Sequence, residues 1–147
     1  MKATLSLLIL LLALVTLPAR GEPGGPVTRE VRVGDGEPVP VQVYGDGPPT
    51  VVWLAPGYGL QDSHRRFAAA LAREGMAAWL VDLPEALFMT RGPDAYRALD
   101  GALVADLLAA AADTGAPVAV MAEEYAAIPA LRGLRAWQAR GGAGERS

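Results

Sequence analysis

The chain has 147 residues, of which 52% are hydrophobic, and a formal net charge of −3 at pH 7. This length suits one domain with a sizeable core, and the lack of a basic surplus argues against a nucleic-acid partner. The sequence contains no cysteine, which excludes disulfides, thiolate metal sites, a cysteine nucleophile and an acylated amino-terminal cysteine.

The first residues have the pattern of a secretory signal peptide. Lys2 supplies a positive charge, and residues 4–17 form an apolar run of about 14 residues, which is short for a membrane span. The small residues at 19 and 21 offer a cleavage site before Glu22. We therefore expect a signal peptide over 1–21 and a periplasmic or secreted protein, which contacts the membrane only if this segment stays uncleaved.

Two alternating segments follow a flexible lead-in at 22–26. Residues 27–33 and 39–44 each alternate apolar with polar side chains, as strands with one buried face do. A turn-forming sequence separates the two segments, so we expect an antiparallel hairpin. Pro40 has no amide hydrogen to donate, which predicts a free edge at that point or a later start of the second strand.

Three continuous apolar runs come next, as expected of strands that are covered on both faces. They span residues 50–55, 76–81 and 117–121. Alternation of such strands with helices predicts an α/β fold with three layers, α/β/α, around a mostly parallel sheet that the hairpin precedes. We expect this domain to cover 27–140, and the glycine-rich segment 141–147 to be a disordered tail.

Helical segments connect and follow these strands. The first is expected to start with Ser63 as its cap and to stop at Gly75. After a loop at 83–92, a long helix is expected from Pro93 to about residue 114, before Gly115. The last helix has three large apolar positions, Leu131, Leu134 and Trp137.

The sequence Ala-Glu-Glu-Tyr-Ala at 122–126 lies between the third apolar strand and the last helix. A nucleophile flanked at two residues' distance by small residues, in this setting, forms the nucleophile elbow of α/β-hydrolases. Residues 53–59 look like the oxyanion loop of that family, and 79–82 look like its fourth strand with a terminal aspartate. The exported part thus resembles the amino-terminal half of an α/β-hydrolase.

The resemblance assigns a role to several residues. It places Glu124 at the nucleophile position of the elbow, and it implies an oxyanion loop that comprises Gly57, Tyr58, Gly59 and Tyr125. The family normally has serine at this position, and its acid and histidine follow later strands. This sequence ends at Ser147, and its single histidine, His64, precedes the elbow.

Two functions are therefore open. We expect an exported α/β-hydrolase-like protein that is catalytically inactive or a fragment of a longer gene product, and that acts through binding or oligomerisation. The alternative is an active esterase or peptidase-like hydrolase of small exported substrates, in which Glu124 replaces serine and His64 acts as its base.

Each candidate residue also has a purely structural explanation. Glu123 and Glu124 are favourable at the start of a helix because of its dipole, and the glycines at 57 and 59 suit any tight strand-to-helix turn. Asp62 and His64 alone make a poor metal site and more simply cap a helix. We expect no cofactor and no bound metal.

In the strand order of the family, the last strand of this chain lies at an open edge of the sheet. An unpaired apolar edge strand promotes association unless something covers it. We therefore expect a homodimer, or a partner chain, that covers this edge.

Overall fold

The computed structural model describes residues 25–141. The predicted signal peptide, positions 22–24 of the lead-in and positions 142–147 of the tail lie outside the described residues. Within the described part, no helix is both long enough and apolar enough to cross a membrane.

A five-stranded mixed sheet forms the centre of the domain, with the order β1-β2-β4-β3-β5. The hairpin pairs β1 (Val27–Val31) with β2 (Val39–Tyr44), and β2 runs antiparallel to β4 (Ala77–Val81). The strands β3 (Thr50–Leu54) and β5 (Val118–Ala122) run parallel to β4. The predicted hairpin and parallel strands are confirmed, although the four pairings divide equally between antiparallel and parallel.

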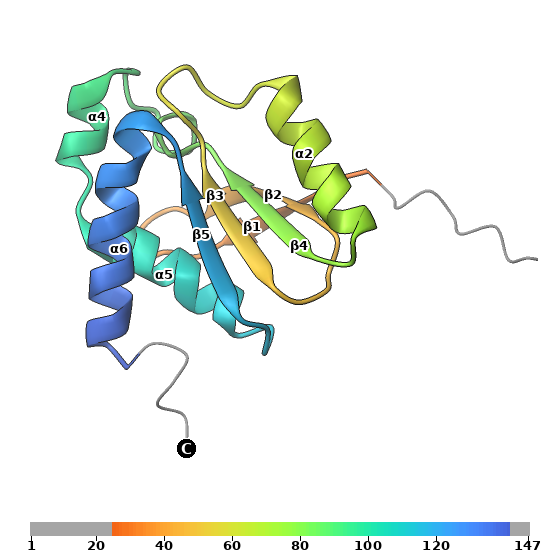
Figure 1. Ribbon diagram of the computed structural model, residues 1–147. Coiled ribbons are helices and arrows are strands. Elements are labelled where there is room, and N and C mark those ends of the chain that lie inside the picture. The colour runs from red at the N-terminus through yellow and green to blue at the C-terminus, as the bar shows by residue number, and fades with distance from the viewer. Residues whose placement is uncertain (1–24, 142–147) are drawn as a thin grey trace, which may run out of the picture.

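Helices cover both faces of this sheet, which confirms the predicted three layers (Figure 1). One face carries α2 (Asp62–Arg73), and the other carries α5 (Gly101–Ala112) and α6 (Ala127–Ala139). The larger core lies beneath α5 and α6, where Trp79, Leu107 and Leu108 are almost fully buried. A smaller core beneath α2 contains Trp53 and Leu80.

The hairpin is held to the rest of the domain by few strand pairings. β2 pairs with β4 only through Gln42, Val43 and Tyr44. Pro40 therefore lies where β2 pairs with β1 alone, opposite Glu30, as expected of a residue that cannot donate to a second neighbour.

The predicted helix from Pro93 to residue 114 is wrong as one element. It is divided into α4 (Pro93–Ala98) and α5, with Leu99 in an extended conformation between them. The side chain of Asp100 accepts a hydrogen bond from the amide of Ala102 at 2.8 Å and so caps α5. A local cap thus interrupts a pattern whose apolar spacing continues across the break.

Three smaller expectations also need correction. The first helix begins at Asp62 with Gln61 as its N-cap, so Ser63 lies inside it, while Gly75 does follow its end with φ +86°. The loop at 83–92 contains a short helix, α3 (Leu83–Ala86). On α6, Leu131 is 68% exposed because the residues that face the core are Ala130, Gly133 and the partly buried Leu134 and Trp137.

Candidate functional site

The strand-to-helix turn after β5 has the backbone shape of an elbow. β5 ends at Ala122, a single 3₁₀ turn, η1 (Glu124–Ala126), follows, and α6 begins directly after it. Glu124 has φ +52°, which is the left-handed region that a residue with a side chain rarely adopts. The residue at the predicted nucleophile position is thus held in a strained conformation at the tip of a sharp turn, as in an elbow.

The predicted oxyanion loop lies against this turn. A β-carbon placed on Gly57 would stand 3.7 Å from a carboxylate oxygen of Glu124, so the two segments are close neighbours. The amide of Gly59 donates to the carbonyl of Pro56 at 2.8 Å, and Gly59 has φ +85°. A side chain on Gly59 would meet the guanidinium of Arg91, so the loop requires glycine there for both conformation and space.

Two side chains from outside the loop fix its position. The buried hydroxyl of Tyr96, on α4, lies 3.0 Å from the carbonyl oxygens of Ala55 and Pro56 and donates to them. Arg91 makes two hydrogen bonds to the buried carboxylate of Asp82, at 3.0 and 2.7 Å. These bonds to Asp82 raise the pKa of Arg91, and they hold the guanidinium against Gly59 of the predicted oxyanion loop.

In the described structure, His64 bonds to Glu123 and Gln61 and makes no bond to Glu124. Nε2 of His64 lies 3.3 Å from Oε1 of Glu123, and Nδ1 accepts a hydrogen bond from the amide of Gln61 at 2.8 Å. Because Nδ1 is an acceptor here, the proton of the neutral ring resides on Nε2 and points to Glu123. Both nitrogens are thus engaged, and neither offers a free lone pair to the elbow.

Glu123 is the centre of this polar cluster. Its Oε1 also accepts from the indole Nε1 of Trp53 at 3.2 Å. The His64 ring stands edge-on to Trp53, with centroids 5.1 Å apart. Glu123 and Glu124 therefore point in different directions, one toward Trp53 and His64 and the other toward Gly57.

The two tyrosines of the predicted oxyanion loop are on the surface. Tyr58 is 54% exposed and Tyr125 is 43% exposed. Partial desolvation, followed by the charges of Glu123 and Glu124, raises the pKa of Tyr58, so its hydroxyl stays protonated at neutral pH. The guanidinium of Arg97 lies 5.7 Å from the centre of the Tyr125 ring.

The residues considered for a metal have other partners. Asp62 pairs with Arg65 at 3.2 Å, and His64 pairs with Glu123. Among residues 25–141, no group of three or more histidine or acidic side chains is placed to hold a metal ion.

The sequence predicted an elbow and a loop beside it, but it did not indicate which contacts three further residues make there. Glu123 and Tyr96 contact residues that lie 70 and 41 positions away in the sequence, and Arg91 contacts Asp82, nine positions away. The aspartate that ends β4 offered one signal, because a buried carboxylate needs a cationic partner. The sequence contains many arginines and does not indicate which one pairs with Asp82.

No family model and no characterised protein sequence matches this chain. Among solved structures it is similar to the thermophilic esterase Est2 of Thermogutta terrifontis, with 18% identity and a TM-score of 0.49, over 74% of this chain and 45% of the esterase. A dienelactone hydrolase candidate of Klebsiella pneumoniae gives 22% identity and a TM-score of 0.45, over 67% of this chain and 50% of the other. The esterase LipW of Mycobacterium marinum has 25% identity to this chain and a TM-score of 0.47, over 79% of this chain and 40% of LipW.

The predicted resemblance to α/β-hydrolases agrees with these structural similarities, which concern the arrangement of the chain alone. The chain spans half or less of the length of these enzymes.

Proposed function

We propose that this protein is an exported α/β-hydrolase-like domain that lacks serine-hydrolase activity and acts by association. The observation that carries the first part is Glu124, a carboxylate held at φ +52° at the tip of the elbow. Serine hydrolases need a hydroxyl at this place and a histidine that takes its proton. Wherever the gene product ends, this position in the chain holds Glu124.

Electrostatics support the same conclusion. In acyl transfer, an oxyanion hole works by placing dipoles that stabilise a developing negative charge. The carboxylate of Glu124 lies close to Gly57, in the loop that would have to provide those dipoles. A fixed negative charge beside this loop opposes the charge that a tetrahedral intermediate would develop.

The test is hydrolysis of p-nitrophenyl acetate by the purified protein and by Glu124→Ala and Glu124→Gln variants. We expect all three to give the same slow rate as the buffer with an unrelated protein. Glu74→Gln, at the exposed end of α2, is the matched control for loss of one negative charge.

The alternative function, in which Glu124 itself catalyses hydrolysis, is favoured by its strained conformation. Left-handed backbone at a residue with a side chain is found often at active sites, where the strain positions a reacting group. That function predicts turnover by the wild type, loss of it in both Glu124 variants, and retention in Glu74→Gln. His64 is not suited to assist, because both of its nitrogens are already hydrogen-bonded.

Export is the second part of the proposal and rests on the apolar amino-terminal segment. The full gene can be expressed in a bacterial host and the periplasmic and culture fractions collected. We expect the protein in those fractions with Glu22 as its first residue, as measured by mass spectrometry. Retention in the cytoplasm at full mass would contradict export.

Association through β5 is the third part. β5 has a paired neighbour, β3, on one side alone among the described residues, and Ala119 in its middle is exposed. A second copy that adds its own β5 would satisfy the free backbone groups of both strands. We expect sedimentation velocity to show a dimer whose fraction grows with concentration.

A charge on the edge strand should abolish that dimer. Ala119→Lys is the test variant, and Ala139→Lys at the exposed end of α6 is its control. If the wild type sediments as a monomer at every concentration, or if Ala119→Lys dimerises like the control, association through β5 is wrong.

A further inference from the structure

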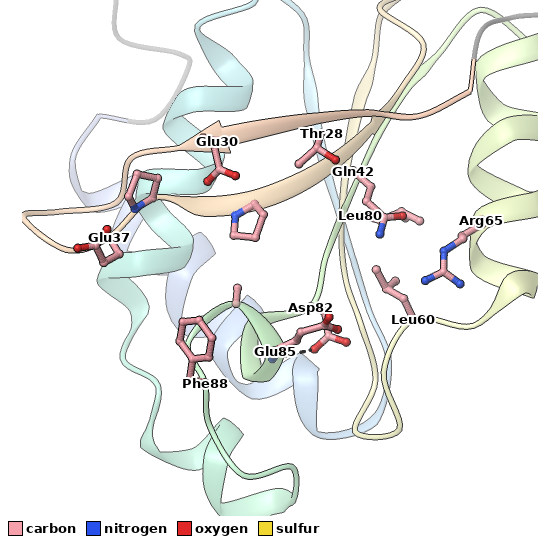
Figure 2. Close-up of a pocket in the computed structure, with 13 residues that line it drawn as sticks. Thr28, Glu30, Glu37, Gln42, Leu60, Arg65, Leu80, Asp82, Glu85 and Phe88 are labelled. Carbon is pink, nitrogen blue, oxygen red and sulfur yellow. Dashed lines mark hydrogen bonds between the residues drawn. The ribbon is translucent and has the colours of Figure 1, made fainter.

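A pocket of about 670 Å³ opens between the hairpin, the end of β4 with α3, and the start of α2 (Figure 2). This volume is in the range of sites that hold small organic molecules. Its described lining includes no residue of the elbow and none of the predicted oxyanion loop. We call it the hairpin pocket, and the function proposed above does not use it.

Carboxylates dominate the polar lining of the hairpin pocket. Glu30 and Glu37 come from the hairpin, and Asp82 and Glu85 come from the end of β4 and from α3. Arg65 is the one cationic side chain among the described lining residues, and it already pairs with Asp62 at 3.2 Å. Figure 2 shows Glu30 and Glu37 at one end of the pocket and Arg65 at the other.

The four carboxylates differ in whether their charge is compensated. Asp82 is buried and bound by Arg91, which also reaches Glu85 at 3.4 Å. In the described structure, the side chains of Glu30 and Glu37 have neither a hydrogen bond nor an ion pair. The hairpin end of the pocket therefore presents negative charge that no neighbouring side chain neutralises.

Apolar surface lies between and beside these charges. Leu80 on β4 and Leu60 before α2 line the pocket, and Phe88 stands at the same end as Glu37 (Figure 2). The Phe88 side chain is 97% exposed and its backbone has φ +53°. A large aromatic ring held in water at the mouth of a pocket is available to cover the apolar part of a ligand.

We propose that the hairpin pocket binds an organic cation, namely a primary ammonium with an alkyl chain of a few carbons. The ammonium lies beside Glu30 and Glu37, and the alkyl chain lies along Phe88. A carboxylate ligand of the same length would meet like charge, and a neutral alcohol would gain only the apolar contact.

The experiment compares three six-carbon probes, hexylammonium, hexanol and hexanoate, in titrations of the purified protein followed by amide NMR shifts at fixed ionic strength. We expect hexylammonium to shift the amides of the hairpin and of α3, and to bind about tenfold more tightly than hexanol, the ratio that one charge-assisted hydrogen bond supplies. Hexanoate binding as tightly as hexylammonium, or shifts that avoid the pocket, would overturn the proposal.

Variants then locate the two parts of the ligand. Glu30→Gln should weaken hexylammonium binding about tenfold and leave hexanol unchanged, whereas the exposed control Glu74→Gln should change neither. Phe88→Ala should weaken both six-carbon probes and leave methylammonium unaffected. Equal effects of Glu30→Gln and Glu74→Gln would mean that general surface charge attracts the amine and that no site exists.

Discussion

At the scale of single residues, Glu124 combines a side chain with a backbone conformation that favours glycine. The left-handed region costs a residue with a β-carbon about 1–2 kcal/mol. The conformation is imposed by the junction, because β5 ends at Ala122 and the helical segment begins at Glu124 itself.

This strain predicts an inverted order of stability at position 124. Glu124→Gly should have a free energy of unfolding about 1 kcal/mol higher than Glu124→Ala, because glycine accepts φ +52° without a steric cost. Urea denaturation of the two variants measures this difference. Ordinary helix propensity predicts the opposite order by about the same amount. If alanine proves the more stabilising of the two, the elbow does not hold position 124 in the left-handed region in solution.

Tyr96 connects α4 to the predicted oxyanion loop through one buried hydroxyl. Tyr96→Phe leaves the carbonyls of Ala55 and Pro56 without this donor, and should cost about 1–3 kcal/mol of unfolding free energy. The same variant has a distinct pH dependence. Burial raises the pKa of Tyr96 from about 10 to about 12, so folding favours the protonated phenol.

The sign of this effect follows from linkage. A group whose pKa is higher in the folded state stabilises the fold fully below its unfolded pKa, and loses that contribution as pH rises through the folded value. The stability advantage of wild type over Tyr96→Phe should therefore shrink between about pH 10 and pH 12. Urea titrations of both proteins across that interval measure the difference, and a constant advantage would contradict the burial of the phenol.

At the scale of elements, α5 and α6 approach each other closely at two glycines. A β-carbon on Gly133 of α6 would overlap the side chain of Val104 on α5, and one on Gly101 of α5 would overlap the backbone of Arg132. The backbone of α6 at Gly133 thus packs directly against Val104, and the backbone of α5 at Gly101 packs against the backbone of Arg132. This close packing covers the larger core.

Gly133→Ala should therefore destabilise the protein although alanine is the better helix former. Overpacking costs about 1–3 kcal/mol, against a gain in propensity of about 1 kcal/mol. Val104→Gly removes both the β-carbon and the γ-carbons that the added methyl would meet, so the double variant should lose less stability than the two single variants together. Additive losses in chemical denaturation would show that the helices do not pack at this distance.

Some of these elements could be predicted from the sequence, and others could not. Continuous apolar runs identify β3 and β4 because these strands are buried on both faces. The break between α4 and α5 could not be predicted from the sequence, because the apolar spacing continues across it. Its cause is the Asp100 cap, along with Arg132 of α6, whose side chain donates to the carbonyls of Arg97 and Leu99.

The candidate site also has features that the sequence could predict and features that it could not. The turn after β5 could be predicted because its residues are consecutive in the sequence. The pairing of His64 with Glu123 was not predictable, since it depends on how α2 and β5 meet across the sheet. Glu123 and His64 are 59 positions apart, and no periodic pattern in the sequence indicates that they are close in space.

At the scale of the whole molecule, the sheet is covered unevenly. β3 is buried throughout and paired with strands on both sides, while β5 shows partial exposure along its whole length. Along β5, Val118, Val120 and Ala122 pack against the larger core, and Met121 reaches the smaller one. Ala119 points to the face that α2 covers only in part, and it remains exposed.

This asymmetry predicts a gradient of amide hydrogen exchange across the sheet. β3 and β4 should exchange most slowly, because their amides open only when the domain unfolds. In dilute protein, the amides on the free side of β5 should exchange fast. At concentrations that favour the proposed dimer, the same amides should become protected while those of β1, at the opposite edge, stay unchanged. Protection that rises equally at β1 and β5 would indicate general stabilisation, and protection of neither would mean that the β5 edge stays unpaired.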